Sequence, residues 1–125
     1  LKSRKAPLFF VTRKTMKRYY KSFDYTLIWV DENGIKERET EHKSGKEDGI
    51  YSLWFDNGQK KEEGPYQGET RIELWTWWDE KGNKWQEGAY LNGERDGTWI
   101  TWNANGKRRN ETLYNNGNFI SKKVY

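Results

Sequence analysis

Residues 50–68, IYSLWFDNGQKKEEGPYQG, contain one complete structural unit of this chain. An aromatic and β-branched run over 50–55 comes first, and the turn sequence Asp56-Asn57-Gly58-Gln59 follows it. A polar run over 60–66 then leads to a second turn at 67–69. Asn-Gly between two such runs favours a type I′ turn, which requires positive φ at both central residues. The stretch therefore predicts one β-hairpin.

The same pattern recurs every 24 residues, beginning with the glycines of the first turn: Gly34, Gly58, Gly82 and Gly106. Three other columns keep this interval: Lys36, Lys60, Lys84 and Arg108; Glu39, Glu63, Glu87 and Glu111; His42, Tyr66, Tyr90 and Tyr114. Second turns fall at Gly45, Gly68, Gly93 and Gly117. Turns at this spacing leave room for strands of about five to seven residues and none for helices. We therefore predict an all-β fold, an elongated twisted antiparallel meander of four ~24-residue β-hairpin repeats.

Two-residue periodicity assigns side chains to the two faces of a sheet. The residues four or five positions before each turn glycine are all tryptophans: Trp29, Trp54, Trp77 and Trp102. We expect them to form one row, and this row to be the core. Leu27, Ser52, Trp75 and Ile100 should share its face. The opposite face becomes more polar towards the C-terminal end, so we expect it to be open there.

The first 23 residues do not fit the repeat and hold eight cations and no acid. We divide the chain into a basic N-terminal cap or arm, 1–23, and a repeat domain, 24–125. Within the cap, Leu8–Val11 predicts a short strand, and 12–23 predicts either a second strand or a short helix. The repeat domain holds 15 cations and 19 acids, a net charge of −4. A basic arm thus precedes a mildly acidic body.

The composition limits which classes of protein fit. Only 33% of the residues are hydrophobic and 34% are charged, but 17% are aromatic, which favours a thin fold built on aromatic rows. Without cysteine the chain has no disulfide and no thiolate zinc site. No stretch approaches the ~20 apolar residues of a membrane span. Because the chain starts at Leu1 rather than Met, removal of a leader or anchor is one interpretation.

The run Tyr90-Leu91-Asn92-Gly93-Glu94-Arg95-Asp96-Gly97-Thr98-Trp99 resembles the core of a MORN repeat, Y-x-x-G-x-x-x-G-x-W. The whole unit resembles the bacterial MORN-variant type, over about Asp24 to Tyr125. The later glycine of the motif is replaced by Ile72 and by Ser121 in two units. This resemblance implies stacked hairpins that form a non-catalytic, protein-binding module. Many bacterial relatives are labelled antitoxin-like, which would imply an antitoxin or immunity-type component and a cytoplasmic location.

Catalytic and metal-binding interpretations find little support. His42 is the only histidine and occupies a tyrosine column, so we expect a ring that fills a Tyr slot rather than a ligand or a catalytic base. Glutamates repeated in every unit, about 9–10 Å apart, indicate a structural job in every unit. Our first expectation is that these glutamates accept hydrogen bonds from turn N–H groups or from an indole. Our second is that they form ion pairs on the surface, and the last is glycosidase-type catalysis. No phosphate-binding loop is present. We expect no enzyme activity, no cofactor and no metal.

The best binding candidates are aromatic. Six residues are predicted to form a protein-binding surface: Tyr51, Phe55, Trp75, Trp78, Trp85 and Trp99. Four cations of the arm are predicted to meet an anionic partner: Lys14, Lys17, Arg18 and Lys21. We expect a protein partner, with anionic lipid or glycan as the alternative, and the acidic body argues against nucleic acid. An exposed edge strand would also allow a homodimer.

Overall fold

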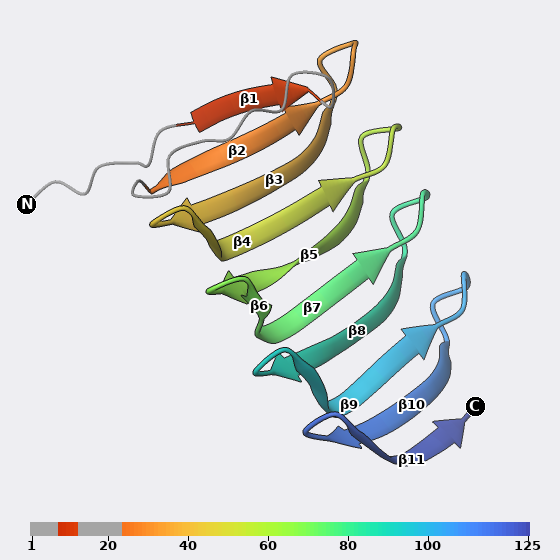
Figure 1. Cartoon of the computed structure of the whole chain (residues 1–125). Helices are drawn as coiled ribbons and strands as arrows, with labels where there is room; N and C mark the ends of the chain where they lie inside the picture. Colours follow the sequence, from red (N-terminus) through yellow and green to blue (C-terminus); the bar gives the residue numbers. More distant parts are fainter. Residues whose placement is uncertain (1–7, 13–23) are drawn as a thin grey trace, which may run out of the picture.

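The computed structural model describes the backbone of residues 8–12 and all atoms of residues 24–125. Every regular element in these ranges is a strand, as predicted (Figure 1). The strands are β1 (Leu8–Thr12), β2 (Tyr25–Val30), β3 (Lys36–Lys43), β4 (Lys46–Trp54), β5 (Lys60–Gln67), β6 (Thr70–Arg71), β7 (Glu73–Trp78), β8 (Lys84–Leu91), β9 (Glu94–Trp102), β10 (Arg108–Asn115) and β11 (Asn118–Val124). The strand predicted at Leu8–Val11 is thus confirmed, and the prediction for 13–23 lies outside the described residues.

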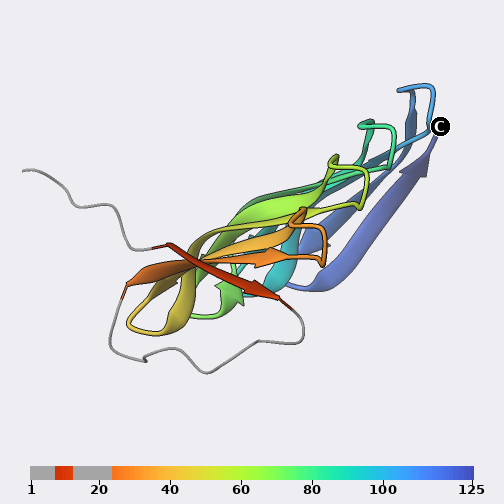
Figure 2. The same cartoon turned by 90° about the horizontal axis from the view of Figure 1, so that it is seen from above.

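All the strands belong to one sheet with the order β1-β2-β3-β4-β5-β7-β8-β9-β10-β11, and the short β6 pairs with β5. β1 runs parallel to β2, and the other pairs are antiparallel. The described strands form a single twisted layer, stepped from one hairpin to the next (Figures 1 and 2). The predicted meander is therefore confirmed. Within the described residues, an apolar side chain on either face can be covered only by other groups of the same sheet.

The two turns of each unit have different backbone geometry. The type I′ turn was predicted at the first turn of the unit, and this prediction is wrong. In the first turns only the glycine has positive φ, for example 86° at Gly58, and the Gly58 N–H donates to the carbonyl oxygen of Phe55. This is a type I turn closed by a left-handed glycine. Two residues with positive φ occur instead in the second turns, such as Asn92 (51°) and Gly93 (85°). The type I′ turn therefore belongs to the second turn.

Every return strand contains an irregularity just after the first turn. Trp78 is opposite Lys84, whereas Trp77 is opposite Gln86, so Trp85 is an extra residue. The equivalent extra residues in the other units are Glu37, Lys61 and Arg109. Such a β-bulge changes which side chains share a face. It places residues three apart, such as Lys84 and Glu87, on the same face.

The expected core row is wrong, because the tryptophans divide between the two faces. Each unit repeats the same strand pairing, so equivalent positions keep the same face in every unit and the columns are strict. One column is Leu27, Tyr51, Trp75 and Trp99. Another, two positions later, is Trp29, Leu53, Trp77 and Thr101, whereas Val30, Trp54, Trp78 and Trp102 form a third. Trp77 and Trp78 are neighbours and face opposite sides. The predicted row mixed offsets of four and five residues from the turn glycine, and so combined members of the second and third columns on one face.

The core lies along the first of these columns. Trp75 is fully buried and Trp99 is 3% exposed, and at the N-terminal end Leu27 is buried too. Each indole lies over a glycine of the neighbouring strand. A Cβ on Gly64 would be 2.2 Å from the Trp75 ring, and one on Gly88 would be 2.1 Å from the Trp99 ring. The glycines are therefore required so that the rings can lie flat on the sheet.

We predict that Gly88→Thr lowers the free energy of unfolding by about 1–3 kcal/mol, because the added side chain overlaps the Trp99 ring. The first and second units meet at the matching pair Thr40 and Tyr51, which are directly opposite each other. The double variant Gly88→Thr/Trp99→Tyr copies that pair and should recover part of the loss in urea unfolding. Strictly additive costs of the two changes would contradict the account.

Glu73 offers a second stability test. It has a φ of 56°, in the left-handed region, at the position where neighbouring units hold Gly49 and Gly97. This identifies Glu73, rather than Ile72, as the residue that replaces the later glycine of the motif. Glu73→Gly should raise the free energy of unfolding by about 1 kcal/mol, since a side chain is disfavoured there. Thr98→Gly, in an extended strand, is the control and should lower it by about 0.5–1 kcal/mol. A loss of stability in Glu73→Gly would refute this interpretation.

Candidate functional site

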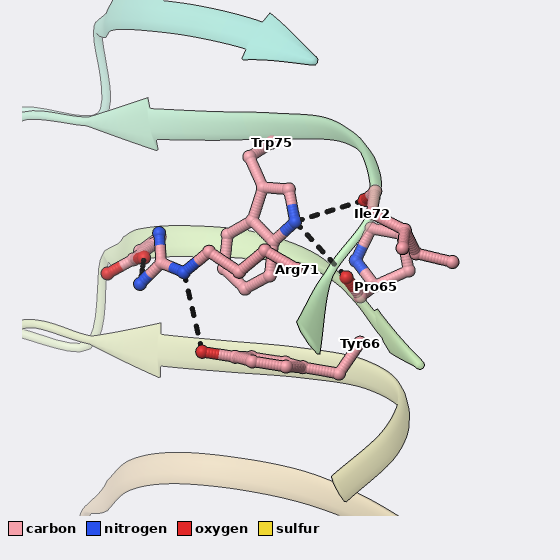
Figure 3. A network of polar contacts seen from close by, with 6 residues as sticks. Pro65, Tyr66, Arg71, Ile72 and Trp75 are labelled. Carbon is pink, nitrogen blue, oxygen red and sulfur yellow. Dashed lines mark hydrogen bonds and ion pairs between the residues drawn. The ribbon is translucent and has the colours of Figure 1, made fainter. Parts of the chain in front are cut away.

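The face of the sheet that carries Tyr51, Tyr66, Trp75, Tyr90, Trp99 and Tyr114 is called here the aromatic face. Around Trp75, the rings of Tyr66 and Tyr90 meet the indole edge-on, with centroid distances of 5.2 and 6.2 Å. The indole Nε1–H donates to the carbonyl oxygens of Pro65 and Ile72, at 3.1 and 3.2 Å (Figure 3). These contacts close off the ring, so it takes part in packing and not in a contact surface.

Arg71 covers the outer side of this ring. Its guanidinium carbon lies 4.2 Å from the Trp75 ring centroid, and its Nη2 is 2.8 Å from Glu62 Oε1. Its Nε donates to the Tyr66 hydroxyl at 3.4 Å (Figure 3). Burial opposes the charge of Arg71, yet Tyr66 and Glu62 raise its pKa above the ordinary value. The ion pair is partly buried and completes the cover of the core.

Trp99 has the same surroundings one unit later. Tyr90 and Tyr114 meet its ring edge-on at 5.1 and 6.3 Å, and Arg95 lies over it at 4.5 Å. The Trp99 Nε1–H donates to the Ala89 carbonyl oxygen at 3.0 Å. The aromatic face is thus a row of closed aromatic clusters, and Tyr90 touches the tryptophans of two units.

The opposite face is called here the ladder face, because its side chains form three rows that cross the strands. The first row alternates cations with tryptophans: Lys36, Trp54, Lys60, Trp78, Lys84, Trp102 and Arg108. The second row is Ile28, Glu39, Ser52, Glu63, Thr76, Glu87, Ile100 and Glu111. The third row, at the end nearest the second turns, is made of the pairs Ile50–Pro65, Leu74–Ala89 and Thr98–Leu113, with a register shift between β8 and β9 that places Ala89 opposite Asp96.

The repeated glutamates pair with cations of their own unit, across the bulge. The Nζ–Oε distances are 2.7 Å for Lys60 and Glu63 and 2.8 Å for Lys84 and Glu87. Lys36–Glu39 and Arg108–Glu111 make the equivalent pairs. The first expectation, bonding to turn N–H groups or to an indole, is wrong, because turn N–H groups go to Asp or Asn side chains of the turns themselves, such as Asp79. The second expectation, surface ion pairing, is confirmed.

The third row of the ladder face is an exposed apolar strip, which we call the apolar row. Leu74 is 53% exposed, Ile50 42% and Leu113 40%. Ile50 lies directly opposite Pro65, and Leu74 directly opposite Ala89. From β4 to β10 the row crosses five strand spacings, about 24 Å. No other described segment of the chain covers this strip (Figure 2).

The six aromatic residues predicted as a protein-binding surface do not lie together. Trp75 and Trp99 are buried in the core, so their predicted exposure is wrong, and Tyr51 belongs to the same column. Phe55 lies at the first turn under the Lys61 ammonium, at 5.3 Å. Trp78 lies on the ladder face, and Trp85 is the exposed residue of a bulge.

The predicted anionic-partner residues Lys14, Lys17, Arg18 and Lys21 lie outside the described residues. The apolar row was missed by sequence reasoning, although its members form two strict 24-residue columns: Thr26, Ile50, Leu74 and Thr98; Glu41, Pro65, Ala89 and Leu113. Assigning each 24-residue column to a single face of the sheet would have revealed the apolar row. The stacked Arg71 and Arg95 were missed as well.

His42 fills a tyrosine slot, as expected. Its ring stacks on Tyr25 with a centroid distance of 4.6 Å and an interplanar angle of 10°. Its Nε2 shares a 2.7 Å hydrogen bond with the Thr40 hydroxyl, and the side chain is buried. Burial lowers the pKa of the imidazole below the ordinary value of 6.5. This arrangement stabilises the neutral ring and the first unit.

Two shallow depressions lie between successive first turns. One, of about 260 Å³, is lined by Phe55, Asp56, Asn57 and Glu80. Another, of about 320 Å³, is lined by Asn83, Lys84, Trp102 and Gly106. No group of three or more His, Cys, Asp or Glu side chains in the described ranges could hold a metal ion. Nor does any helix there have the length and apolarity to span a membrane.

Comparison with protein families matches two stretches of the chain, 47–67 and 95–116, to the MORN repeat variant. These stretches are the β4–β5 and β9–β10 hairpins, each with its first turn in the middle. Searches of curated proteins and of solved structures return no match.

The burial of His42 predicts a pH dependence. Because its pKa is lower in the folded state, the unfolded chain holds more protons just below pH 6.5, so the free energy of unfolding falls as the pH decreases through that range. His42→Gln should show a smaller loss between pH 7.5 and 5.0 in urea unfolding. NMR titration of the His42 ring should give a pKa below 6.5. A value above 6.5 would contradict this account.

Proposed function

From the premise that the chain carries repeats of the MORN variant, we propose that it is a non-catalytic module that binds another protein through the ladder face. Repeats of this family are interaction modules, which supports a binding role in general. The observation that carries the proposal is the apolar row. Contiguous exposed apolar side chains on a rigid surface are typical of protein interfaces. On the aromatic face, by contrast, the large apolar rings are already packed against one another.

The chemistry of the ladder face fits a protein contact. Burial of the apolar row would supply the main affinity, and Trp78 in the first row would add an aromatic anchor. The paired Lys and Glu side chains of the other rows would form a polar rim, which sets the orientation of the partner more than the affinity. Trp85 remains a proposed contact at the bulge. Trp75, Trp99 and Tyr51 are removed from the contact surface because they form the core.

The biological setting is proposed from the resemblance alone. Bacterial MORN-variant proteins labelled antitoxin-like suggest an antitoxin or immunity-type component, whose partner would be a toxin encoded beside it. The alternative function, binding of anionic lipid or glycan, depends on the eight cations of residues 1–23. A homodimer would use the outer edges of β1 or β11. These alternatives are separate outcomes of the experiment below.

We predict that Leu74→Glu combined with Ile50→Glu removes a co-purifying protein partner, because both charges fall within the apolar row, at its two most exposed large hydrophobic members. Exposed substitutions of this kind change the free energy of unfolding by about 0.5 kcal/mol or less, so the fold should persist. Ile35→Glu is the matched control, since Ile35 is 40% exposed but lies at a first turn. The tagged chain is purified from its native host, and captured proteins are identified by mass spectrometry.

Retention of the partner by the double variant would overturn the assignment of the ladder face. Binding to vesicles containing anionic lipid that disappears when Lys14, Lys17 and Arg18 are neutralised, with no protein captured, would favour the alternative. A mass of two chains that survives the double variant would indicate edge pairing instead.

A further inference from the structure

Two arginines on the aromatic face pack in the same way on the tryptophans of successive units. Arg71 and Arg95 are 24 residues apart, and their guanidinium carbons lie 4.2 and 4.5 Å from the rings of Trp75 and Trp99. The guanidinium of Arg71 lies 5.6 Å from the ring of Tyr90, and that of Arg95 lies 5.5 Å from the next ring of the column. Stacking between two aromatic rings holds each guanidinium in a fixed position. Any difference in the ligand that the two arginines bind must therefore come from the residues beside them.

The carboxylate partner is the difference. Arg71 pairs with Glu62, a side chain that is 12% exposed. The equivalent of Glu62 one unit later is Gln86, a neutral residue. Among residues 24–125, no carboxylate oxygen lies within 4.0 Å of the Arg95 guanidinium, and its hydrogen bond goes to the Tyr114 hydroxyl at 3.2 Å. Arg95 is also exposed, whereas Arg71 is half-buried.

The neighbours of Gln86 are also hydrogen-bonding groups. Gln86 lies directly opposite Thr101 on the adjacent strand, and Thr101 lies directly opposite Asn110. The Thr101 hydroxyl is buried and has no hydrogen-bond partner among the described residues. A buried hydroxyl without a partner is unusual in native proteins, because its desolvation is not compensated. The junction of the third and fourth units thus combines an unneutralised guanidinium with amide groups and an unsatisfied hydroxyl.

We infer that Arg95, Gln86 and Thr101 form a site on the aromatic face for a carboxylate, supplied by an Asp or Glu side chain of a protein that contacts this face. The Glu62–Arg71 pair shows how a carboxylate would bind at this site, because Arg71 packs on its tryptophan in the same way as Arg95 and holds a carboxylate of the same chain. A guanidinium fork matches a carboxylate in geometry and charge, and the preordered stacking reduces the entropy lost on binding. This contact lies on the face opposite to the ladder face, so it is separate from the contact proposed above; that a protein supplies the carboxylate rests on the proposed binding role, whereas the carboxylate chemistry does not.

Exchange of one residue between the two units tests this inference. Sodium acetate is titrated into the ¹⁵N-labelled chain at constant ionic strength set with sodium chloride, and the Arg95 Nε–H and Trp99 Nε1–H signals are followed. Saturable shifts are expected in the unmodified chain. Gln86→Glu supplies an internal carboxylate and should weaken acetate binding at least tenfold while the melting temperature is kept or raised.

Glu62→Gln is the reciprocal variant, and it should create saturable acetate shifts at the Arg71 Nε–H and Trp75 Nε1–H signals. No saturable shift in the unmodified chain, or unchanged binding in a folded Gln86→Glu variant, would overturn the site. Once a protein that contacts the aromatic face is known, Gln86→Glu should also weaken that complex at least fivefold. Unchanged affinity for the partner would overturn its assignment as the source of the carboxylate, and the acetate result stands apart from whether any partner is captured.

Discussion

The fold depends on one contact, the face of an indole lying on a glycine of the neighbouring strand. Among the described residues no second sheet or helix covers this single-layer sheet, and the rings of Trp75 and Trp99 are covered by groups of the sheet itself. Burial of Trp75 and Trp99 supplies roughly 4–6 kcal/mol of gross transfer free energy each. Only a residue without a side chain lets the ring lie this close, which ties Gly64 and Gly88 to the two tryptophans.

The same contact explains why the two faces have different roles. On the aromatic face, tyrosine edges and a stacked arginine close the cluster around each indole, so the rings that a composition analysis would select as binding residues are used in packing. On the ladder face, the bulge after each first turn brings a cation and a glutamate together. Their mutual neutralisation leaves the apolar row as the exposed feature of that face. The proposed contact surface therefore consists of side chains that are not part of the core.

Much of the architecture followed from the sequence, because glycine columns at a fixed interval specify turns directly. The strand positions, the absence of helices in the described ranges and the tyrosine slot of His42 were all predicted. The faces were not, because the bulge changes the alternation inside each unit and two tryptophan columns stand side by side in the sequence. Trp77 and Trp78 illustrate this, since nothing in their residue type says which one faces the core. The burial of Trp99 likewise depends on Gly88, a partner eleven positions earlier.

The most direct measurement is the ¹H chemical shift of the glycine α-protons in the native chain. A proton beneath the face of an indole is shielded by its ring current. The account therefore predicts strongly upfield-shifted α-protons for Gly64 and Gly88, with nuclear Overhauser contacts to the Trp75 and Trp99 rings respectively. Glycine α-protons with ordinary shifts and no contact to an indole would show that the rings do not lie on these strands, and would contradict the central claim.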